Sequence, residues 1–226
     1  MSAESGLQTF RDAGGLWEGY SIEDVATPEG FERNPARVLD FYNEIRKRVR
    51  TAQPNPAHRA LVELEAQFDV HIITQNVDDL HERAGSQQVI HLHGEISKAR
   101  SIASADCLVP YEEDIKLGDL APDGAQLRPH VVWFGEMVPK IYEAADIVET
   151  ADIIIIVGTS LAVYPASSLV ELAPPTAPIY VVDPHKPDFH MSSISEERIT
   201  FLTSKASTGI PKLVLHLLTD HERLDI

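Results

Sequence analysis

The pattern of apolar and polar positions is most informative between residues 70 and 94, where two short apolar runs each end in polar side chains. The run at 70–73 is rich in β-branched residues and predicts a buried strand. The polarity changes abruptly after it, at the amide side chains of Gln75 and Asn76. A second apolar run at 89–92 predicts another strand, which ends at His93. Because ligands bind at the carboxyl ends of strands in open parallel sheets, these polar groups are expected to lie close together.

A short helix is expected between the two strands, over residues 80–84. Asp78 or Asp79 can cap its first turn, because their side chains accept hydrogen bonds from the free amide groups of a helix start. Gly85 suits the left-handed conformation that often ends a helix.

Two longer helices are predicted upstream of this stretch. Asn34 and Pro35 are favoured at a helix start, and apolar residues then recur at three- and four-residue spacing as far as residue 50. Asn55 and Pro56 begin a second helix in the same way.

The last third of the chain has the pattern of an α/β protein. The continuous apolar run at 153–157 predicts a parallel strand that is covered on both faces, and small polar residues follow it at 158–160. Further strands are expected at 179–182, which ends at Asp183, and at 199–202 on the sheet edge. The expected fold class is therefore α/β, with a doubly wound, mainly parallel Rossmann-like sheet.

Composition and charge narrow the range of partners. The chain has 226 residues and a net charge of −16, which argues against a nucleic-acid partner and is compatible with basic peptides. Cys107 is the single cysteine, so no internal disulfide can form and a cytoplasmic location is expected. No apolar run is long enough for a membrane span, so no membrane partner is expected. The oligomeric state stays open.

The motifs at the predicted strand ends resemble those of the sirtuins, the NAD-dependent protein lysine deacylases. The family's Thr-Gln-Asn-(Ile/Val)-Asp stands here at 74–78, its Leu-His-Gly at 92–94 and its Gly-Thr-Ser at 158–160. The resemblance implies NAD as the cofactor and acylated lysines of proteins or peptides as substrates. The acyl group would be transferred to ADP-ribose with release of nicotinamide.

The same resemblance implies a role for each residue of these motifs. His93 would be the general base, since the pKa of histidine lies near neutrality; without the motifs, a strand histidine is more commonly a core residue. Asn76 would hold the ribose and a water, Gln75 would orient the ribose, and Asp78 would accept a hydrogen bond from the nicotinamide amide. The other cofactor-binding residues that the resemblance implies are Phe10, Arg11, Gly158, Thr159, Ser160, Asp183 and Ala206.

The start of the chain departs from the family pattern. Sirtuins open with a strand and Gly-Ala-Gly, followed by the segment that residues 2–11 resemble. Neither the strand nor the glycines are present, so the chain is expected to lack the beginning of the functional protein. The missing strand would be central in a doubly wound sheet.

The substrate side resembles the class III branch, which removes acidic acyl groups such as succinyl. Ala13 and Tyr42 match the Phe-Arg-x-Ala and Tyr-x-x-Arg motifs of that branch, but Ile45 stands at the arginine position. Arg46 lies about 40° around the helix from Tyr42 and is a candidate replacement. Without an arginine clamp a bound carboxylate would be left unpaired, so acetyl or longer apolar acyl groups are the expected substrates.

A segment over 131–136 resembles the strand-like stretch that pairs with the substrate peptide in the family. Its candidate substrate-binding residues are Val132, Trp133, Phe134, Gly135 and Glu136.

Most sirtuins hold structural zinc with four cysteines before this segment. Residues 97–127 supply only Cys107 and no histidine, whereas a tetrahedral zinc site needs four such ligands, so no metal is expected. The chain is expected to be a single catalytic domain over 1–226, with a small domain made of two insertions at about 14–54 and 97–128. The second insertion is expected to consist of apolar contacts and turns, with the substrate cleft between the small domain and the sheet.

Three other functions are left open by the sequence. An NAD hydrolase would use Asn76 and His93 but release free ADP-ribose, and a non-catalytic NAD or ADP-ribose sensor would bind without turnover. A metal hydrolase could be built from His81, His91, His93 and Asp78, although no other metal-binding side chains cluster with them in the sequence.

Overall fold

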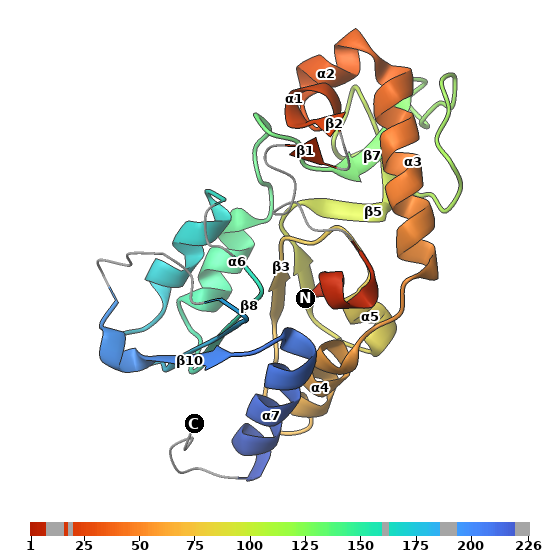
Figure 1. Cartoon of the computed structure of the whole chain (residues 1–226). Helices are drawn as coiled ribbons and strands as arrows, with labels where there is room; N and C mark the ends of the chain where they lie inside the picture. The colour runs from red at the N-terminus through yellow and green to blue at the C-terminus, as the bar shows by residue number, and fades with distance from the viewer. Residues whose placement is uncertain (8–15, 18–19, 160–162, 186–193, 220–226) are drawn as a thin grey trace.

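The computed structural model describes residues 1–7, 16–17, 20–159, 163–185 and 194–219 (Figure 1). Within these ranges, β3 (Ile72–Thr74) pairs in parallel with β4 (Val89–His91). β8 (Ile154–Val157), β9 (Ile179–Asp183) and β10 (Ile199–Thr203) form a parallel sheet in the order β10-β9-β8. The expected α/β class with parallel strands is therefore confirmed, as is the edge position of the strand at 199–203.

The remaining helices and strands fall into an N-terminal group, an antiparallel group and a C-terminal group. They are η1 (Ser2–Ser5), β1 (Leu16–Trp17), β2 (Tyr20–Ser21), α1 (Ile22–Val25), α2 (Pro28–Arg33), α3 (Pro35–Thr51), α4 (Pro56–Leu64), α5 (Leu80–Ala84), β5 (Gly94–Ser101), β6 (Leu108–Pro110), β7 (Leu127–Val131), α6 (Ile141–Val148), η3 (Ala166–Leu172), η4 (Glu196–Arg198) and α7 (Ala206–Thr219). No helix in the described ranges is both long and apolar enough to cross a membrane.

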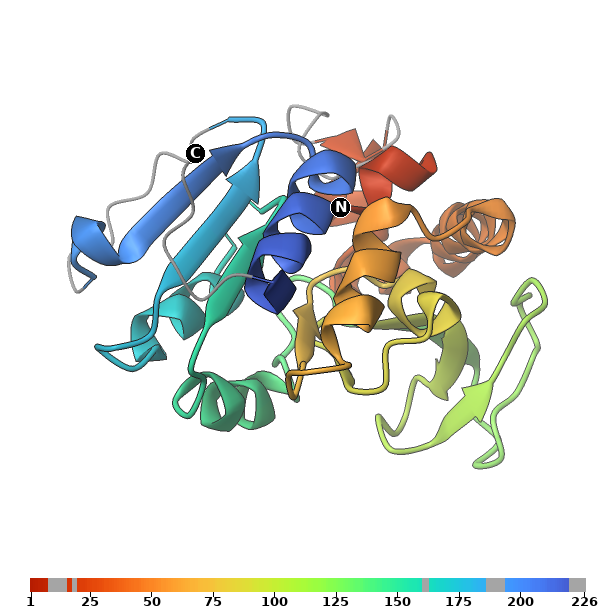
Figure 2. The same ribbon diagram turned by 90° about the horizontal axis from the view of Figure 1, so that it is seen from below.

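Helices cover the parallel strands on two faces. α4 and α7 lie side by side on one face, and α6 and η3 pack on the other (Figures 1 and 2). Ile155 and Val157 of β8 face the first pair, whereas Ile154 and Ile156 face the second. This alternation explains the continuous apolar run, since both faces of a β-strand are covered here. Each large side chain that is fully buried in this way stabilises the fold by about 1.5–3 kcal/mol.

The parallel strands do not form one continuous sheet in the described part of the chain. β3 has β4 on one side and β8 has β9 on one side, but no hydrogen-bonded ladder joins β3 to β8. We call the two unpaired sides of β3 and β8 the open edges. The single doubly wound sheet expected from the sequence is therefore seen as two parallel pieces.

A second core lies beside the parallel strands and is built from α1, α2, α3 and the antiparallel sheet β6-β5-β7 (Figure 1). Buried residues from Val25 to Val49 meet others from Ile96 to Trp133 in this core. The antiparallel sheet was not expected, because turns and apolar contacts alone were predicted for this stretch. The two segments that supply the core coincide with the two expected insertions, whose boundaries stay a prediction.

Local capping explains where several helices begin. The Asn34 side chain accepts a hydrogen bond from the Arg37 amide at the start of α3, and Asn55 with His58 forms a capping box on α4. At α5 it is Asp78, not Asp79, whose carboxylate accepts from the Leu80 amide.

Candidate active site

Polar side chains from both parallel pieces meet at the carboxyl ends of their strands. The Gln75 amide, just after β3, donates a hydrogen bond to the Thr159 hydroxyl, just after β8, over 3.2 Å. Gly158 donates its backbone N–H to the Val182 carbonyl at 3.0 Å, which ties the end of β8 to β9. Asp183, the last residue of β9, is buried beside this junction. The segments predicted to bind NAD are therefore adjacent, as expected for the carboxyl ends of parallel strands.

The N-terminal helix η1 completes this junction. The Asn76 side-chain amide donates to the Ser2 hydroxyl at 2.9 Å, and that hydroxyl is also hydrogen-bonded to the Asp78 carboxyl group. The Glu4 carboxylate accepts from the Ser207 backbone N–H at 3.3 Å, in the first turn of α7. Ser2 and Glu4 were not among the predicted site residues, although Ser2 belongs to the motif that residues 2–11 match.

Asp78 lies at the base of the site and is 5% exposed. Burial raises the pKa of its carboxyl group, an effect that hydrogen bonds from Ser2 and the Leu80 amide partly offset. A carboxyl group in these surroundings favours neutral hydrogen-bonding partners that compensate for its lost hydration.

His93 follows β4 and is oriented by the chain beside it. Its Nδ1 lies 3.1 Å from the Gln75 carbonyl oxygen, and because a carbonyl can only accept, Nδ1 carries the hydrogen. Burial lowers the pKa of His93 more than this hydrogen bond raises it. The ring is therefore neutral at pH 7 with its lone pair on Nε2, which is the form that can accept a proton.

Gly94 explains why a glycine follows this histidine. Its φ is +80°, and a Cβ atom here would collide with the carbonyl oxygen of His130 on the neighbouring strand β7. Only glycine lets β5 begin directly after His93 while pairing with β7.

The segment expected to pair with a substrate peptide differs from the prediction. β7 ends at Val131, and residues 132–136 form a turn in place of the expected strand. The Val132 amide donates to the His93 carbonyl and the Phe134 amide to the Ala26 carbonyl, both at 2.9 Å. Strand pairing is prevented here because these donors are already used within the chain.

Glu136 holds this turn in place. Its carboxylate accepts from the Trp133 amide at 2.8 Å and pairs with Arg100 and Arg128, each at 2.7 Å. The Arg128 guanidinium also lies 3.2 Å from the centre of the Trp133 ring. Gly135 is exposed, and Phe134 is 46% exposed, so these two remain available to a partner.

Several residues expected to bind the acyl group lie in the second core. Tyr42 is 1% exposed and Trp133 is 3% exposed, and the Trp133 Nε1–H donates to the Tyr42 hydroxyl at 2.9 Å. Burial raises the pKa of that hydroxyl. Ile45 is also buried in this core.

Arg46 is corrected most clearly. Its Nε donates to the Ile96 carbonyl at 2.9 Å, and its Nη1 donates to the Glu113 carbonyl at 2.9 Å and to the Asn43 side chain at 3.1 Å. The helical spacing left open that Arg46 reaches the acyl group, but most of its donors instead hold the second core together.

The other predicted residues are distributed as follows. Ala206 is buried at the start of α7, in the same core cluster as Val182. Phe10, Arg11, Ala13 and Ser160 lie outside the residues that the structure describes.

The geometry fits a nucleotide such as NAD on the observed chemistry of its side chains. Amide, hydroxyl and carboxyl groups from Gln75, Asn76, Asp78 and Thr159 converge at the strand ends, and the first turn of α7 points a backbone N–H toward the same junction. Ribose hydroxyls and a carboxamide need donors and acceptors of these kinds.

Comparisons with known proteins agree with this geometry. A model of the Sir2 family matches residues 1–165. An NAD-dependent protein deacylase of Bacteroides thetaiotaomicron is 52% identical over 221 residues, which cover 94% of this chain and 92% of that protein. A solved Sir2 homolog–NAD complex has a TM-score of 0.82 at 40% identity, covering 96% of this chain and 85% of that one. A Sir2 homologue variant bound to ADP-ribose has a TM-score of 0.85, also at 40% identity, covering 96% of this chain and 88% of that one.

Proposed function

The chain belongs to the Sir2 family and is an NAD-dependent protein deacylase, and we propose which of its residues carry the reaction. NAD, when bound, supplies the ribose carbon that accepts the acyl oxygen as nicotinamide leaves. The substrate is an acylated lysine of a protein or peptide.

His93 is the general base of this proposal. Its Nδ1–H is fixed on the Gln75 carbonyl, so Nε2 is the atom that removes a proton from a ribose hydroxyl. Burial lowers the pKa of His93, which keeps the base in its active neutral form at pH 7. This oriented neutral imidazole is the observation that carries the assignment.

The side chains around His93 bind and orient. Asn76 holds the ribose and a water through its side-chain amide, Gln75 orients the ribose, and Asp78 accepts a hydrogen bond from the carboxamide. Gly158, Thr159, Asp183 and Ala206 line the remainder of the nucleotide site in this proposal, together with Phe10, Arg11 and Ser160.

Product analysis of His93→Ala tests the assignment. We expect kcat/KM for deacylation to fall by roughly 10²–10⁴-fold, which is the usual contribution of a general base, while NAD affinity changes little. Retained deacylation by the folded variant would contradict the role of His93. Free ADP-ribose formed without lysine deacylation in the wild-type protein would instead favour an NAD hydrolase, and binding without turnover would favour a sensor.

The acyl specificity of this site follows from the fate of two residues on α3. Ile45 stands where a cation is needed, and Arg46 is committed to backbone carbonyls. We therefore propose that acetyl or longer apolar acyl groups are preferred to succinyl. Rates on matched acetyl- and succinyl-lysine peptides test this, and faster removal of succinyl would contradict it.

We also propose that the second core holds without structural zinc. The support is the single cysteine of the chain and the polar contacts of α3 with residues 112–115. Elemental analysis after extensive dialysis should find no stoichiometric zinc.

A further inference from the structure

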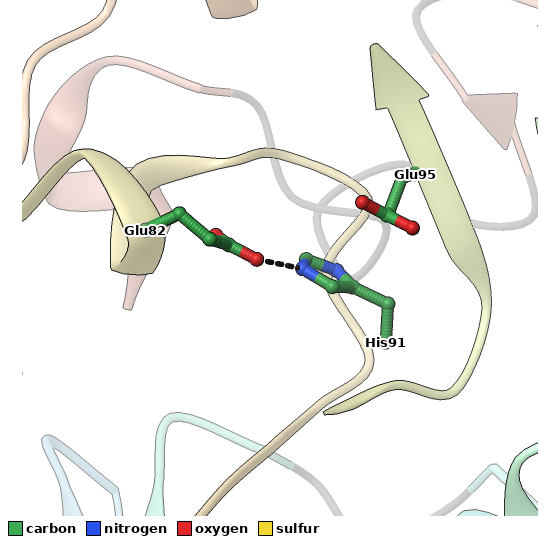
Figure 3. A group of neighbouring side chains, drawn as sticks. All are labelled: Glu82, His91 and Glu95. Atoms are coloured by element: carbon green, nitrogen blue, oxygen red, sulfur yellow. Dashed lines mark hydrogen bonds and ion pairs between the residues drawn. The ribbon is translucent and has the colours of Figure 1, made fainter. Parts of the chain in front are cut away.

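The ring of His91 lies behind the segment that carries Asn76, at the end of β4 (Figure 3). Its side chain is only 6% exposed. Nδ1 lies 3.0 Å from the Asn76 backbone oxygen, and Nε2 lies 2.7 Å from a carboxylate oxygen of Glu82 on α5. Both ring nitrogens therefore face an oxygen at hydrogen-bonding distance.

Hydrogen accounting fixes the state of this ring. A carbonyl oxygen can only accept, and an ionised carboxylate can only accept, so both nitrogens must carry a hydrogen. A neutral imidazole has only one N–H. Glu82 has a side chain that is 39% exposed, so its carboxylate is hydrated and stays ionised. The two contacts together require an imidazolium ion.

The groups that face His91 favour the same charge. Glu95 on β5 points toward the ring from the side opposite Glu82 (Figure 3), and one oxygen or nitrogen of each of the three side chains lies within 4.8 Å of the others. Asp78 also interacts with the ring, and the nearby His81 is neutral because burial lowers its pKa to about 4. Burial acts to lower the pKa of His91, but hydrogen bonds to Glu82 and the Asn76 carbonyl outweigh it, so the net pKa is raised.

We propose that His91, as an imidazolium ion paired with Glu82, is a positioning residue that fixes the Asn76 peptide and thereby the Asn76 side chain. The inference rests on the proposed role of Asn76 in binding ribose. His93 holds the Gln75 carbonyl and His91 holds the next one, so two rings fix two successive peptide groups. The backbone cannot then rotate between them, and the Asn76 amide is presented in one direction.

This arrangement predicts a bell-shaped pH profile made by two histidines of one strand end. Activity rises as pH passes the lowered pKa of His93, because the base must be neutral. It falls as pH passes the raised pKa of His91, because the cation that holds Asn76 is then lost.

The same three acidic and imidazole side chains raise one competing explanation, a bound divalent cation. The ion pair is favoured because both nitrogens of His91 are already engaged and because Lys98 binds Glu95 at 2.7 Å. Metal binding is therefore treated as an outcome of the test.

Glu82→Gln is the decisive variant, because glutamine keeps an oxygen that accepts from Nε2 but carries no charge. We expect the alkaline limb of kcat/KM for NAD to move to lower pH by about one unit, about a tenfold loss on that limb, while the acid limb stays in place. Glu63→Gln, an exposed residue of α4, is the matched control and should leave both limbs unchanged. An alkaline limb that does not move in Glu82→Gln would overturn the proposal.

A second measurement does not depend on activity. Long-range ¹H–¹⁵N NMR of the histidine rings should show both nitrogens of His91 protonated at pH 7, with the signals assigned by their loss in His91→Gln. A neutral His91 ring at pH 7, or stoichiometric zinc that survives dialysis and is lost in Glu82→Gln, would overturn the proposal. Failure of the assigned roles of Asn76 and His93 would appear separately, in the products of His93→Ala.

Discussion

At the scale of single residues, His91 and His93 have the same side chain but different surroundings. Each donates from Nδ1 to a carbonyl oxygen of the segment after β3. Only His91 has a carboxylate on its second nitrogen, and this contact raises its pKa where burial alone lowers that of His93. One carboxylate thus separates a cation that positions the chain from a neutral base.

Tyr42→Phe tests whether the tyrosine hydroxyl serves the core or the acyl group. Removing it leaves the buried Trp133 Nε1–H without this acceptor, so the free energy of unfolding should fall by about 1–3 kcal/mol. The ratio of acetyl to succinyl removal should stay the same. Urea unfolding and rates on both peptides measure these effects, with the 73%-exposed Tyr142 changed to Phe as the control. A changed ratio with unchanged stability would place the hydroxyl at the acyl group.

At the scale of elements, the polar face of α3 holds the segment at 112–115. Asn43 donates to the Ile115 carbonyl and accepts from the Ile115 amide, both at 2.9 Å, and Arg46 reaches the Glu113 carbonyl. These bonds join a helix to a segment about 70 positions away in the chain. They fasten the part of the second core where most sirtuins use zinc.

Arg46→Met should loosen this part selectively. The Ile96 and Glu113 carbonyls lose their donor, so we expect the stability of the second core to fall by about 3 kcal/mol and KM for peptide to rise. Hydrogen exchange at 112–115 should quicken while NAD affinity changes less. Lys47→Met is the control, since its ion pairs with Glu44 and Asp114 are exposed and contribute little. Equal exchange in both variants would contradict this role of Arg46.

A buried histidine pair joins α4 to α5 and makes their contact sensitive to acid. The rings of His58 and His81 lie 4.9 Å apart, and burial is the main cause that lowers their pKa to about 3 and about 4. In the unfolded chain both pKa values return to about 6.5, so the unfolded state binds more protons below that pH. Their contribution is intact above pH 6.5 and is lost as pH falls toward 4.

We therefore expect the free energy of unfolding to fall between pH 6.5 and 4.5, by up to about 1.4 kcal/mol per pH unit for each histidine. Urea titrations across this range measure the slope. His58→Gln keeps an oxygen that can accept from the Asn55 amide but removes the titration, so it should have a shallower slope. His216→Gln on α7 is the control and should keep the wild-type slope. An unchanged slope in His58→Gln would show that other groups cause the acid sensitivity.

Features set by neighbouring residues could be predicted from the sequence, and features set by distant ones could not. Asn34 and Pro35 mark the start of α3 because capping involves only the next few residues. The bond from Trp133 to Tyr42 joins positions 91 residues apart and carries no local signal. The direction of Arg46 was equally hidden, because helical spacing gives its face but not the carbonyls that lie opposite. His91 was missed because its importance depends on Glu82, which reaches it from another element.

At the scale of the whole molecule, the net charge of −16 acts on substrates before they bind. A negative surface attracts basic peptides, and salt screens this attraction. We expect KM for an acyl-lysine peptide flanked by arginines to rise between 50 and 500 mM NaCl. A peptide of the same acyl group with neutral flanks should change little. The same salt response for both peptides would show that the surface charge does not steer substrates.

The open edges of β3 and β8 bear on how the protein behaves at high concentration. Unpaired N–H and C=O groups on a strand edge are a template for pairing with another chain, and the half-buried Ile155 and Val157 accompany one of these edges. Repulsion between copies that each carry a charge of −16 opposes such pairing. Salt weakens this repulsion together with the attraction for basic peptides, so colloidal stability and substrate capture should decline over the same range of ionic strength.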